Sequence, residues 1–580
     1  MRAPSCPSVS YVFRSCALKR AGDGGGCPDI LKKLDNASNL ILEKRKVLQV
    51  KNMKRFLALL LIVTLCAAAL PALAETGVEQ TLKIATVAEG ASDKTVYPWH
   101  NPGGIASSAM YRTLLLAQSN LTDVNPDLAE SYSMSEDSLT YTFKLKENLR
   151  WSDGEPLTAQ DVKNSVKTVL KVSACNAIFT NAFNRIKGAA AWKDGSATDL
   201  EGVKTDGNTV VIELDSSFGA FLQVIAQFVI LPEHAIKDID PLDLNNSSYW
   251  SAPVTSGAFK LAEMSAGNYY VLVPNEYYEG TPWKITKIIS YFVPDMITAA
   301  QAGNVDYFNT NSTDIINEMK KLDYMTMYPV DILFFRYFIC NMKGVDGNEN
   351  TVMQDVRVRE AILYAIDREA LAANLFPGLA TVVNSGVPND YPEYNGKVYE
   401  YNPEKAKELL KEAGYDFNHT FRILYYYSDQ TSIDFMDAIA YYLGEVGMKV
   451  ETVYSQQGTT DLYETRNYDI GYKGLSAFSI AEWYGEYNSK NVYFQKIFGG
   501  DTQFDELVAA IAAEANPEKR SEILKQLEEL EQKNLYKLPL YTIGNNVFIN
   551  TSHVKLPEDV QLGNPWYLHN MDLANWEIIG

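Results

Sequence analysis

The chain has 580 residues, of which 46% are hydrophobic, and a formal net charge of −20. This length exceeds what one ordinary hydrophobic core supports, so we expect two or more lobes in a folded soluble protein. Residues 1–74 hold 12 Lys or Arg and 4 Asp or Glu, which leaves −28 on the remainder. That acidic balance argues against nucleic acid and anionic lipid as partners.

Residues 53–74 predict an export signal. A basic start at 53–55 precedes an apolar run at 56–65, and Ala72-Leu73-Ala74 is a small-residue cleavage site. We therefore expect a signal peptide over 53–74 that is cleaved after Ala74. The protein would then be periplasmic, or extracellular and associated with the membrane. The alternative is an uncleaved membrane span, because the uncharged run is long enough to cross a bilayer.

Cys66 offers a second alternative, a lipid anchor, which Leu65 disfavours because a small residue is wanted before a lipidated cysteine. Residues 1–52 show no sustained period, and we expect them to be a non-native extension, with translation starting at Met53; a disordered tail is the alternative. After processing only Cys175 and Cys340 remain. No CxxC pair is present, so two buried free thiols are favoured over a disulfide, and no zinc site is expected.

From residue 81 onward, short apolar runs alternate with helical patterns, which is typical of an α/β fold. Residues 82–87 predict a first strand. Residues 141–146 alternate apolar and polar side chains, as in a half-buried strand, and Asp153-Gly154 predicts a turn. Thr158, followed three residues later by Asp161, predicts the capped start of a helix.

Three later helices are clear from their start signals and apolar faces. Asp355 precedes one, Asn402-Pro403 starts a second, which Gly414 ends, and Asn516-Pro517 starts a third. Their inward residues are expected to be Ala361, Ile362, Ala365 and Ile366; Ala406, Leu409, Leu410 and Ala413; and Ile523, Leu524, Leu527 and Leu530. Glu528 and Glu529 on the third helix are expected to be solvated charge.

One stretch resembles a known family closely. Residues 126–162 match the pattern of the extracytoplasmic solute-binding proteins of ABC transporters, specifically the peptide and oligopeptide-binding family, solute-binding family 5. The matching positions are Pro126, Leu128, Ala129, Glu130, Ser131, Tyr141, Phe143, Leu145, Trp151, Asp153, Gly154, Pro156, Thr158, Ala159, Asp161 and Val162. Tyr132 and Ser138 depart from the family's usual Trp and Gly. Further similarity at 255–261, 274–278, 355–368 and 405–415 extends the resemblance from about Thr81 to the C-terminus.

The resemblance implies a type II periplasmic-binding fold, with two lobes joined by a hinge of two strands and an extra inserted domain. Lobe I would comprise 75–118, 253–338 and 545–580. The inserted domain would span 119–252, and lobe II would span 339–544. Such a protein binds a peptide or peptide-like solute between its lobes, without chemistry and without a cofactor, and delivers it to the permease and ATPase of an ABC importer. The family implies a monomer.

Two groups of residues are candidate ligand contacts. Tyr97 and Trp99 follow the first strand, where loops line the cleft of α/β folds; the alternative is that they cap the core of lobe I. His100 is expected to be a surface or structural residue. In the second group, the resemblance aligns residues 468–487 with a cleft-lining segment of the family, in which we select Tyr472, Gly474, Leu475, Ser476, Phe478 and Trp483.

Phe478 lies where peptide-binding members have an aspartate that pairs with the peptide's α-ammonium group. A phenyl ring cannot offer that charge-assisted bond. Either Glu482 or Glu486 replaces the aspartate, or the cargo lacks a free amino terminus. The alternatives are therefore a non-peptide solute, such as an oligosaccharide or a chelated metal, or a sensor on the same fold. A secreted hydrolase is a remote rival, because the chain has no GxSxG, no HExxH and only scattered histidines.

Overall fold

The structure is a computed structural model that describes residues 79–87, 96–100, 103–344, 350–491 and 494–579. The predicted extension at 1–52, the signal peptide at 53–74 and the lipid alternative at Cys66 lie outside the described residues. Within the described ranges, no helix is both long enough and apolar enough to span a membrane.

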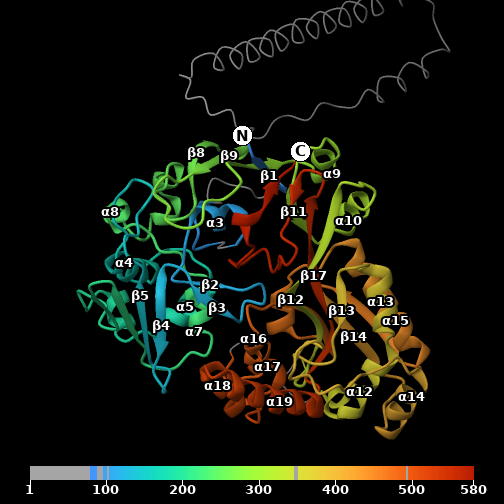
Figure 1. The fold of residues 1–580 in the computed structure, drawn as a ribbon. Helices are drawn as coiled ribbons and strands as arrows, with labels where there is room; N and C mark the ends of the chain where they lie inside the picture. The colour runs from blue at the N-terminus through green and yellow to red at the C-terminus, as the bar shows by residue number, and fades with distance from the viewer. Residues whose placement is uncertain (1–78, 88–95, 101–102, 345–349, 492–493, 580) are drawn as a thin grey trace, which may run out of the picture. The chain divides into compact units, whose positions relative to one another are not determined.

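An 11-stranded mixed sheet dominates the fold (Figure 1). Its strand order is β15-β14-β16-β12-β17-β11-β1-β10-β9-β8, and β13 pairs with β17 beside this path. In chain order the strands are β1 (Thr81–Val87), β8 (Phe259–Ser265), β9 (Tyr269–Pro274), β10 (Lys287–Val293), β11 (Tyr307–Thr310), β12 (Met325–Cys340), β13 (Ala380–Val382), β14 (Thr420–Tyr425), β15 (Lys449–Tyr454), β16 (Ile470–Ser476) and β17 (Lys537–Asn550). The first strand confirms the expectation for 82–87.

Two hydrophobic cores lie along this sheet. The first core is built mainly from residues 82–292 and 547–576, and the second core mainly from 296–548. The long antiparallel strands β12 and β17 contribute to both: Val330 and Val547 belong to the first core, whereas Phe338 and Leu538 belong to the second. These two strands therefore connect the cores, as the predicted hinge strands would.

A separate four-stranded antiparallel sheet adds to the first core. Its order is β4 (Ala129–Met134), β5 (Thr140–Leu145), β7 (Thr209–Glu213) and β6 (Val203–Asp206). The predicted alternation holds in β5, where Tyr141, Phe143 and Leu145 are buried. The predicted capping box also holds: α4 (Ala159–Val169) begins after Thr158, whose backbone N–H donates to Asp161 at 2.8 Å.

The three predicted helices form with the expected caps. They are α12 (Val356–Ala365), α14 (Pro403–Glu412) and α19 (Pro517–Asn534), and their N-cap side chains Asp355, Asn402 and Asn516 each accept a backbone N–H of the first turn. Other helices that contribute to the second core are α9 (Met296–Gln301), α10 (Thr313–Met319), α11 (Thr351–Gln354), α13 (Arg368–Leu375), α15 (Gln430–Glu445), α16 (Ile480–Gly485), α17 (Gln495–Phe498) and α18 (Asp505–Ala513).

Two expectations about side chains need correction or refinement. Glu528 is fully buried rather than solvated, because its carboxylate accepts from the Ser385 hydroxyl at 2.7 Å and the Asn395 N–H at 2.9 Å; Glu529 is exposed as expected. Both described cysteines are free, and Cys340 is buried whereas Cys175 is only half-buried.

Candidate functional site

A cavity of about 360 Å³ opens where the connecting strand β12 meets the start of α15. Its lining combines polar and aromatic side chains. It is lined by Asn311, Ser312, Thr313, Phe334, Arg336, Phe376, Leu379, Asp429, Thr431, Ser432, Tyr472 and Ile543. Phe376, Leu379, Tyr472 and Ile543 belong to the second core, and Phe334 packs against both cores, so the cavity lies on the second core's side of the connecting strand β12.

Arg336 is the only cation that lines this cavity. Its guanidinium carbon lies 3.9 Å from the ring centre of Tyr427, 4.6 Å from that of Phe334 and 5.5 Å from that of Tyr472. Guanidinium groups stack favourably on such rings, since the ring face carries partial negative charge. The aromatic side chains thus hold Arg336 in place without neutralising it.

Gly474 makes room for this stack. It pairs with Arg336 across β16 and β12, and a Cβ atom at Gly474 would lie 2.9 Å from the Tyr427 hydroxyl and 3.0 Å from Arg336 Nη1. Such distances are shorter than real Cβ contacts, so any larger residue would displace the guanidinium or the ring. The structure places Gly474 directly beside the cavity, as selected from sequence.

Tyr472 is the other selected residue at this place. It lines the cavity, and its hydroxyl bonds that of Tyr541; burial raises the pKa of Tyr472 to about 12, so the phenol stays neutral. Leu475 and Ser476 continue β16 opposite Phe335 and Phe334, and Ser476 is exposed. Neither of these two lines the cavity.

Tyr97 and Trp99 pack inside the first core, 2% and 0% exposed. The Tyr97 hydroxyl donates to the Ala174 carbonyl at 3.1 Å, and Trp99 Nε1 donates to the Val229 carbonyl at 2.8 Å. This packing favours the alternative in which both rings cap the core. Their role as ligand contacts stays a prediction. His100, outside the core, is exposed.

Trp483 is likewise fully buried, in the second core. Its ring packs against Phe335 and Tyr337, each at 4.7 Å between centroids, and its Nε1 donates to Glu531 at 2.8 Å. A ligand in the cavity would not touch it in this structure. A tryptophan at this position of the sequence is compatible with core packing as well as with ligand binding. In the core, its indole N–H needs a hydrogen-bond acceptor, which Glu531 provides.

Of the two carboxylates that could replace the family's aspartate, Glu486 is occupied. It forms ion pairs with Lys473 and Lys537, both at 2.8 Å, and accepts the Tyr337 hydroxyl. These partners hold the pKa of Glu486 below its usual value despite burial. Glu482 has no ion pair among the described residues. The Glu482 side chain is exposed, and desolvation of its carboxylate, with repulsion from Glu486, raises its pKa above the usual value.

Phe478, at the aspartate's position, is 6% exposed and packs on Tyr567 at 4.9 Å between ring centres. Tyr567 lies against the first core, and Phe478 clusters with that core although its neighbour Ala477 belongs to the second. The substitution therefore replaces an ionic group with an aromatic contact between the two cores.

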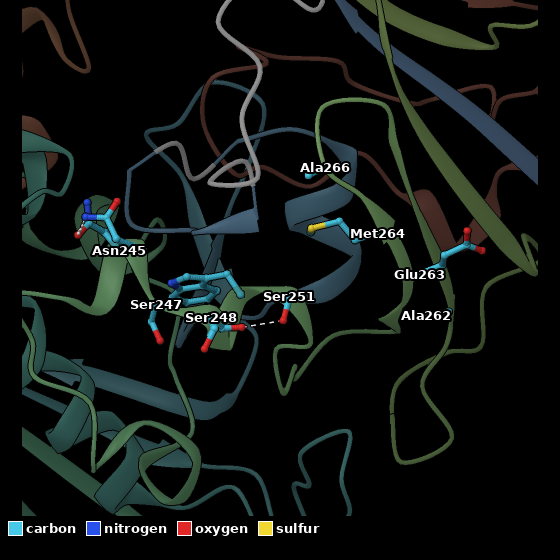
Figure 2. A pocket seen from close by; sticks show the side chains of 10 residues that line it. Asn245, Ser247, Ser248, Ser251, Ala262, Glu263, Met264 and Ala266 are labelled. Carbon is cyan, nitrogen blue, oxygen red and sulfur yellow. Dashed lines mark hydrogen bonds between the residues drawn. The ribbon is translucent and has the colours of Figure 1, made fainter.

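A larger hollow of about 470 Å³ lies elsewhere (Figure 2). It is lined by Asn245, Asn246, Ser247, Ser248, Trp250, Ser251, Ala262, Glu263, Met264 and Ala266. Ser251 donates to the Ser248 carbonyl at 2.7 Å, and the carboxylate of Glu263 accepts the Tyr269 hydroxyl. None of the selected residues lines it, and no cation does. We therefore prefer the cavity at Arg336.

Arg336 was not selected from sequence, although a signal was present. It is the one charged residue in the apolar run ILFFRYFIC at 332–340. Charged residues are rarely buried unless they have a partner, so a lone arginine in such a run indicates a specific role. No cluster of three or more His, Cys, Asp or Glu side chains suited to a metal ion occurs in the part of the chain that the structure describes.

Comparisons with known proteins agree with the resemblance. The model of bacterial extracellular solute-binding proteins, family 5 (middle), matches residues 123–505. A protein of Brucella ovis, named as a candidate ABC transporter peptide-binding protein, is 28% identical over 371 residues, which cover 60% of this chain and 66% of that protein. The match therefore spans just under two thirds of that relative.

Two further relatives cover more of the chain. The oligopeptide-binding protein AppA of Bacillus subtilis is 24% identical over 509 residues, 83% of this chain and 88% of AppA. The crystal structure of the ABC transporter substrate-binding protein CtaP from Listeria monocytogenes superposes with a TM-score of 0.68 at 20% identity, covering 86% of this chain and 99% of CtaP. The predicted two-lobed type II periplasmic-binding fold is thus confirmed, and the chain belongs to the bacterial extracellular solute-binding proteins of family 5.

Proposed function

We propose that this protein is an extracytoplasmic receptor that captures a peptide-like solute between its lobes and delivers it to the permease and ATPase of an ABC importer. The observation that carries the proposal is the cavity at Arg336, which lies on the strands that connect the two cores. Closure of two lobes on a ligand removes it from water and strengthens its polar contacts. The names of AppA and of the Brucella protein favour a peptide as the cargo.

The same proposal includes several finer points. Binding, without catalysis and without a cofactor, is the whole activity. The mature protein starts after Ala74 outside the cytoplasm and acts as a monomer. Lobe I comprises 75–118, 253–338 and 545–580, the inserted domain 119–252, and lobe II 339–544. The ligand contacts are Tyr472 and Gly474 from the sequence-based selection, together with Arg336 and Phe334.

A non-peptide cargo is the second candidate, and Phe478 is the observation that favours it. The ring fills the place of the ammonium-binding aspartate, and Glu486 is engaged with two lysines. Only Glu482 is left to receive an ammonium group, and its raised pKa works against the ionised form that this role requires.

Native mass spectrometry of gently purified mature protein tests the proposal. We expect a bound mass of a few hundred daltons that fragments as a short peptide, released by mild unfolding and replaced by added peptide. Co-purification of a permease and an ATPase from native membranes would separate transport from sensing. A bound mass that fragments as a glycan or a metal chelate would contradict the peptide proposal, and so would turnover of the bound molecule.

A further inference from the structure

The two cores also meet at a place away from the connecting strands β12 and β17. The loop at 216–220 lies in the predicted inserted domain, directly before α7 (Phe221–Ile225), and its Phe218 packs against the first core. The Gly219 N–H donates to the Ala512 carbonyl at 2.9 Å. Ala512 is in the last turn of α18, whose buried side chains belong to the second core. A backbone hydrogen bond therefore joins the inserted domain to the second core, where Figure 1 shows α18 beside α7.

This contact requires a glycine because there is no space for a side chain. A Cβ atom at Gly219 would lie 2.2 Å from the Glu514 carbonyl oxygen and 2.4 Å from Arg520 Nη1, and both distances are shorter than real Cβ contacts. Gly219 is buried and does not adopt a positive φ, so the requirement is for close approach and not for backbone freedom. A methyl group at this position would keep the two segments apart, while the loop itself could still form.

Residues of the inserted domain hold the loop in shape. Arg185 Nη1 donates to the Ser216 hydroxyl and to the Ser217 carbonyl, both at 3.2 Å. The guanidinium of Arg185 also lies 5.2 Å from the ring centre of Phe218, and the Phe218 carbonyl accepts the Phe221 N–H at 3.0 Å. These contacts stay within the inserted domain, so the loop is ordered before it touches α18 and loses little conformational entropy on docking.

The other partner is held in shape by the second core. Arg520, near the start of α19, donates from Nη1 to the Ile511 carbonyl at 3.0 Å and to the Glu514 carbonyl at 2.8 Å. The Glu514 carboxylate accepts the Asn516 N–H at 2.8 Å, and Asn516 caps α19. The turn between α18 and α19 therefore presents the Ala512 carbonyl at a fixed position, independently of the loop.

Movement of the lobes must break this contact. Its two partners belong to different cores, and the cores are connected through β12 and β17. Lobes that swing apart about these strands separate Gly219 from Ala512, so the hydrogen bond exists only when the lobes are closed. A contact made in only one of two states favours that state by its own free energy. Neither residue lines the cavity at Arg336, so the effect does not depend on which cargo is bound.

We propose that the loop at 216–220 is a latch, which fastens the inserted domain to the turn between α18 and α19 when the receptor closes and slows the release of cargo. The inserted domain then has a function of its own in the binding cycle. The inference rests on the proposed function and deepens it, since it names what holds the closed state besides the cargo. A latch changes the affinity for every cargo by the same factor, whereas a ligand contact discriminates among them.

The test combines hydrogen–deuterium exchange, small-angle scattering, calorimetry and stopped-flow fluorescence on the mature protein at pH 7. The variant is Gly219→Ala, and Gly444→Ala is the matched control. Gly444 is exposed, does not adopt a positive φ, and a Cβ atom added to it meets nothing within 4 Å. The probes are tetrapeptides of differing charge, and exchange and scattering are measured both without a probe and at saturation.

We expect Gly219→Ala to bind every probe about 3–10-fold more weakly than the wild type does, which is the contribution of one net hydrogen bond. The loss should appear in the dissociation rate, because the latch forms after the cargo enters. Amides at 216–221 and 511–516 should exchange faster in Gly219→Ala, and its ligand-free radius of gyration should be larger. Exchange in β5 and β14 should stay unchanged, since neither core depends on the latch. Gly444→Ala should match the wild type throughout.

Three results would overturn the inference. One is a Gly219→Ala protein whose affinity, radius of gyration and exchange at 216–221 all equal those of Gly444→Ala. A second is a loss of affinity that differs strongly among the probes, which would place Gly219 at the cargo. The third is faster exchange in β5, which would make Gly219 a packing residue of the inserted domain. Failure of the proposed function alone looks different: no tetrapeptide binds the wild type, yet Gly219→Ala still speeds exchange at the latch and enlarges the ligand-free protein.

Discussion

Glu482 shows how desolvation by neighbouring groups can shift the charge of a residue that solvent still reaches. It lies on α16, near Phe478 and Tyr567. Burial, with a smaller contribution from the charge of Glu482, raises the pKa of the Tyr567 phenol to about 12. With no cation to offset desolvation, the pKa of Glu482 rises from 4.5 to about 7. Solvent reaches this exposed side chain and screens the shift, so Glu482 is partly protonated near neutral pH and is a weaker ammonium acceptor than an unshifted carboxylate.

Replacing Glu482 with Gln should change how stability depends on pH. Because the folded state holds the proton more tightly than the unfolded state, the wild type is most favoured below pH 4.5 and loses stability as the pH rises through about 7. Glu482→Gln cannot ionise, so it should be more stable than the wild type at pH 8, by no more than about 1 kcal/mol because solvent screens the exposed carboxylate, and about equal to it at pH 4.

Urea unfolding of both proteins across this pH range measures the difference, with the exposed Glu529→Gln as the control. A gap between Glu482→Gln and the wild type that stays constant with pH would show that Glu482 ionises normally in the folded state.

At the scale of elements, α19 is attached to α16 through a buried carboxylate. Glu531 accepts from Trp483 Nε1 at 2.8 Å, from the Tyr484 and Tyr487 hydroxyls at 3.0 Å each, and from the Gly386 N–H at 2.9 Å. Each donor would otherwise be buried without an acceptor. One side chain thus fixes the helix that carries Trp483 and Glu482.

Glu531→Ala should therefore lower stability strongly, by about 3–5 kcal/mol, because it leaves four buried donors without an acceptor. Glu529→Ala, two residues away and exposed, should change stability by less than about 0.5 kcal/mol. Urea unfolding followed by tryptophan fluorescence compares the two. Equal effects would mean that the buried network adds nothing to stability.

The helices were predictable because their signals are local. Asp355, Asn402 and Asn516 cap helices wherever the following residues form an apolar face, and the structure confirms all three. Burial of charge was not predictable in this way. Glu528 lies beside the exposed Glu529, and only the packing of Ser385 and Asn395 against α19 determines which of the two is buried.

At the scale of the whole molecule, the family and its two-lobed fold followed from the motif at 126–162, whereas the ligand contacts selected from sequence stay predictions. Tyr472 and Gly474 border the cavity, but Trp99 and Trp483 are 0% exposed. An aromatic residue after a strand suits a core as well as a ligand, and tertiary packing decides between them. Arg336 depends on pairing between β12 and β16, which no local pattern reveals.

Phe478 provides the clearest test of motion between the lobes. Its ring contacts Tyr567 at 4.9 Å and clusters with the first core, while Ala477 before it belongs to the second. If the lobes swing apart to admit cargo, this contact must break, and its apolar burial then favours the closed state. Phe478→Ala should therefore raise the radius of gyration of the ligand-free protein and weaken cargo binding roughly tenfold.

Small-angle scattering with and without ligand, together with calorimetry, measures both effects of Phe478→Ala. Phe417→Ala is the matched control, because Phe417 is 41% exposed and its ring meets that of Tyr415 edge-on, within the second lobe's side of the molecule. With ligand bound, the radius of gyration of Phe478→Ala should return to the wild-type value, since the cargo still favours closure. An unchanged radius and an unchanged affinity would mean that Phe478 and Tyr567 stay in contact throughout the cycle, and the hinge would then have to act elsewhere.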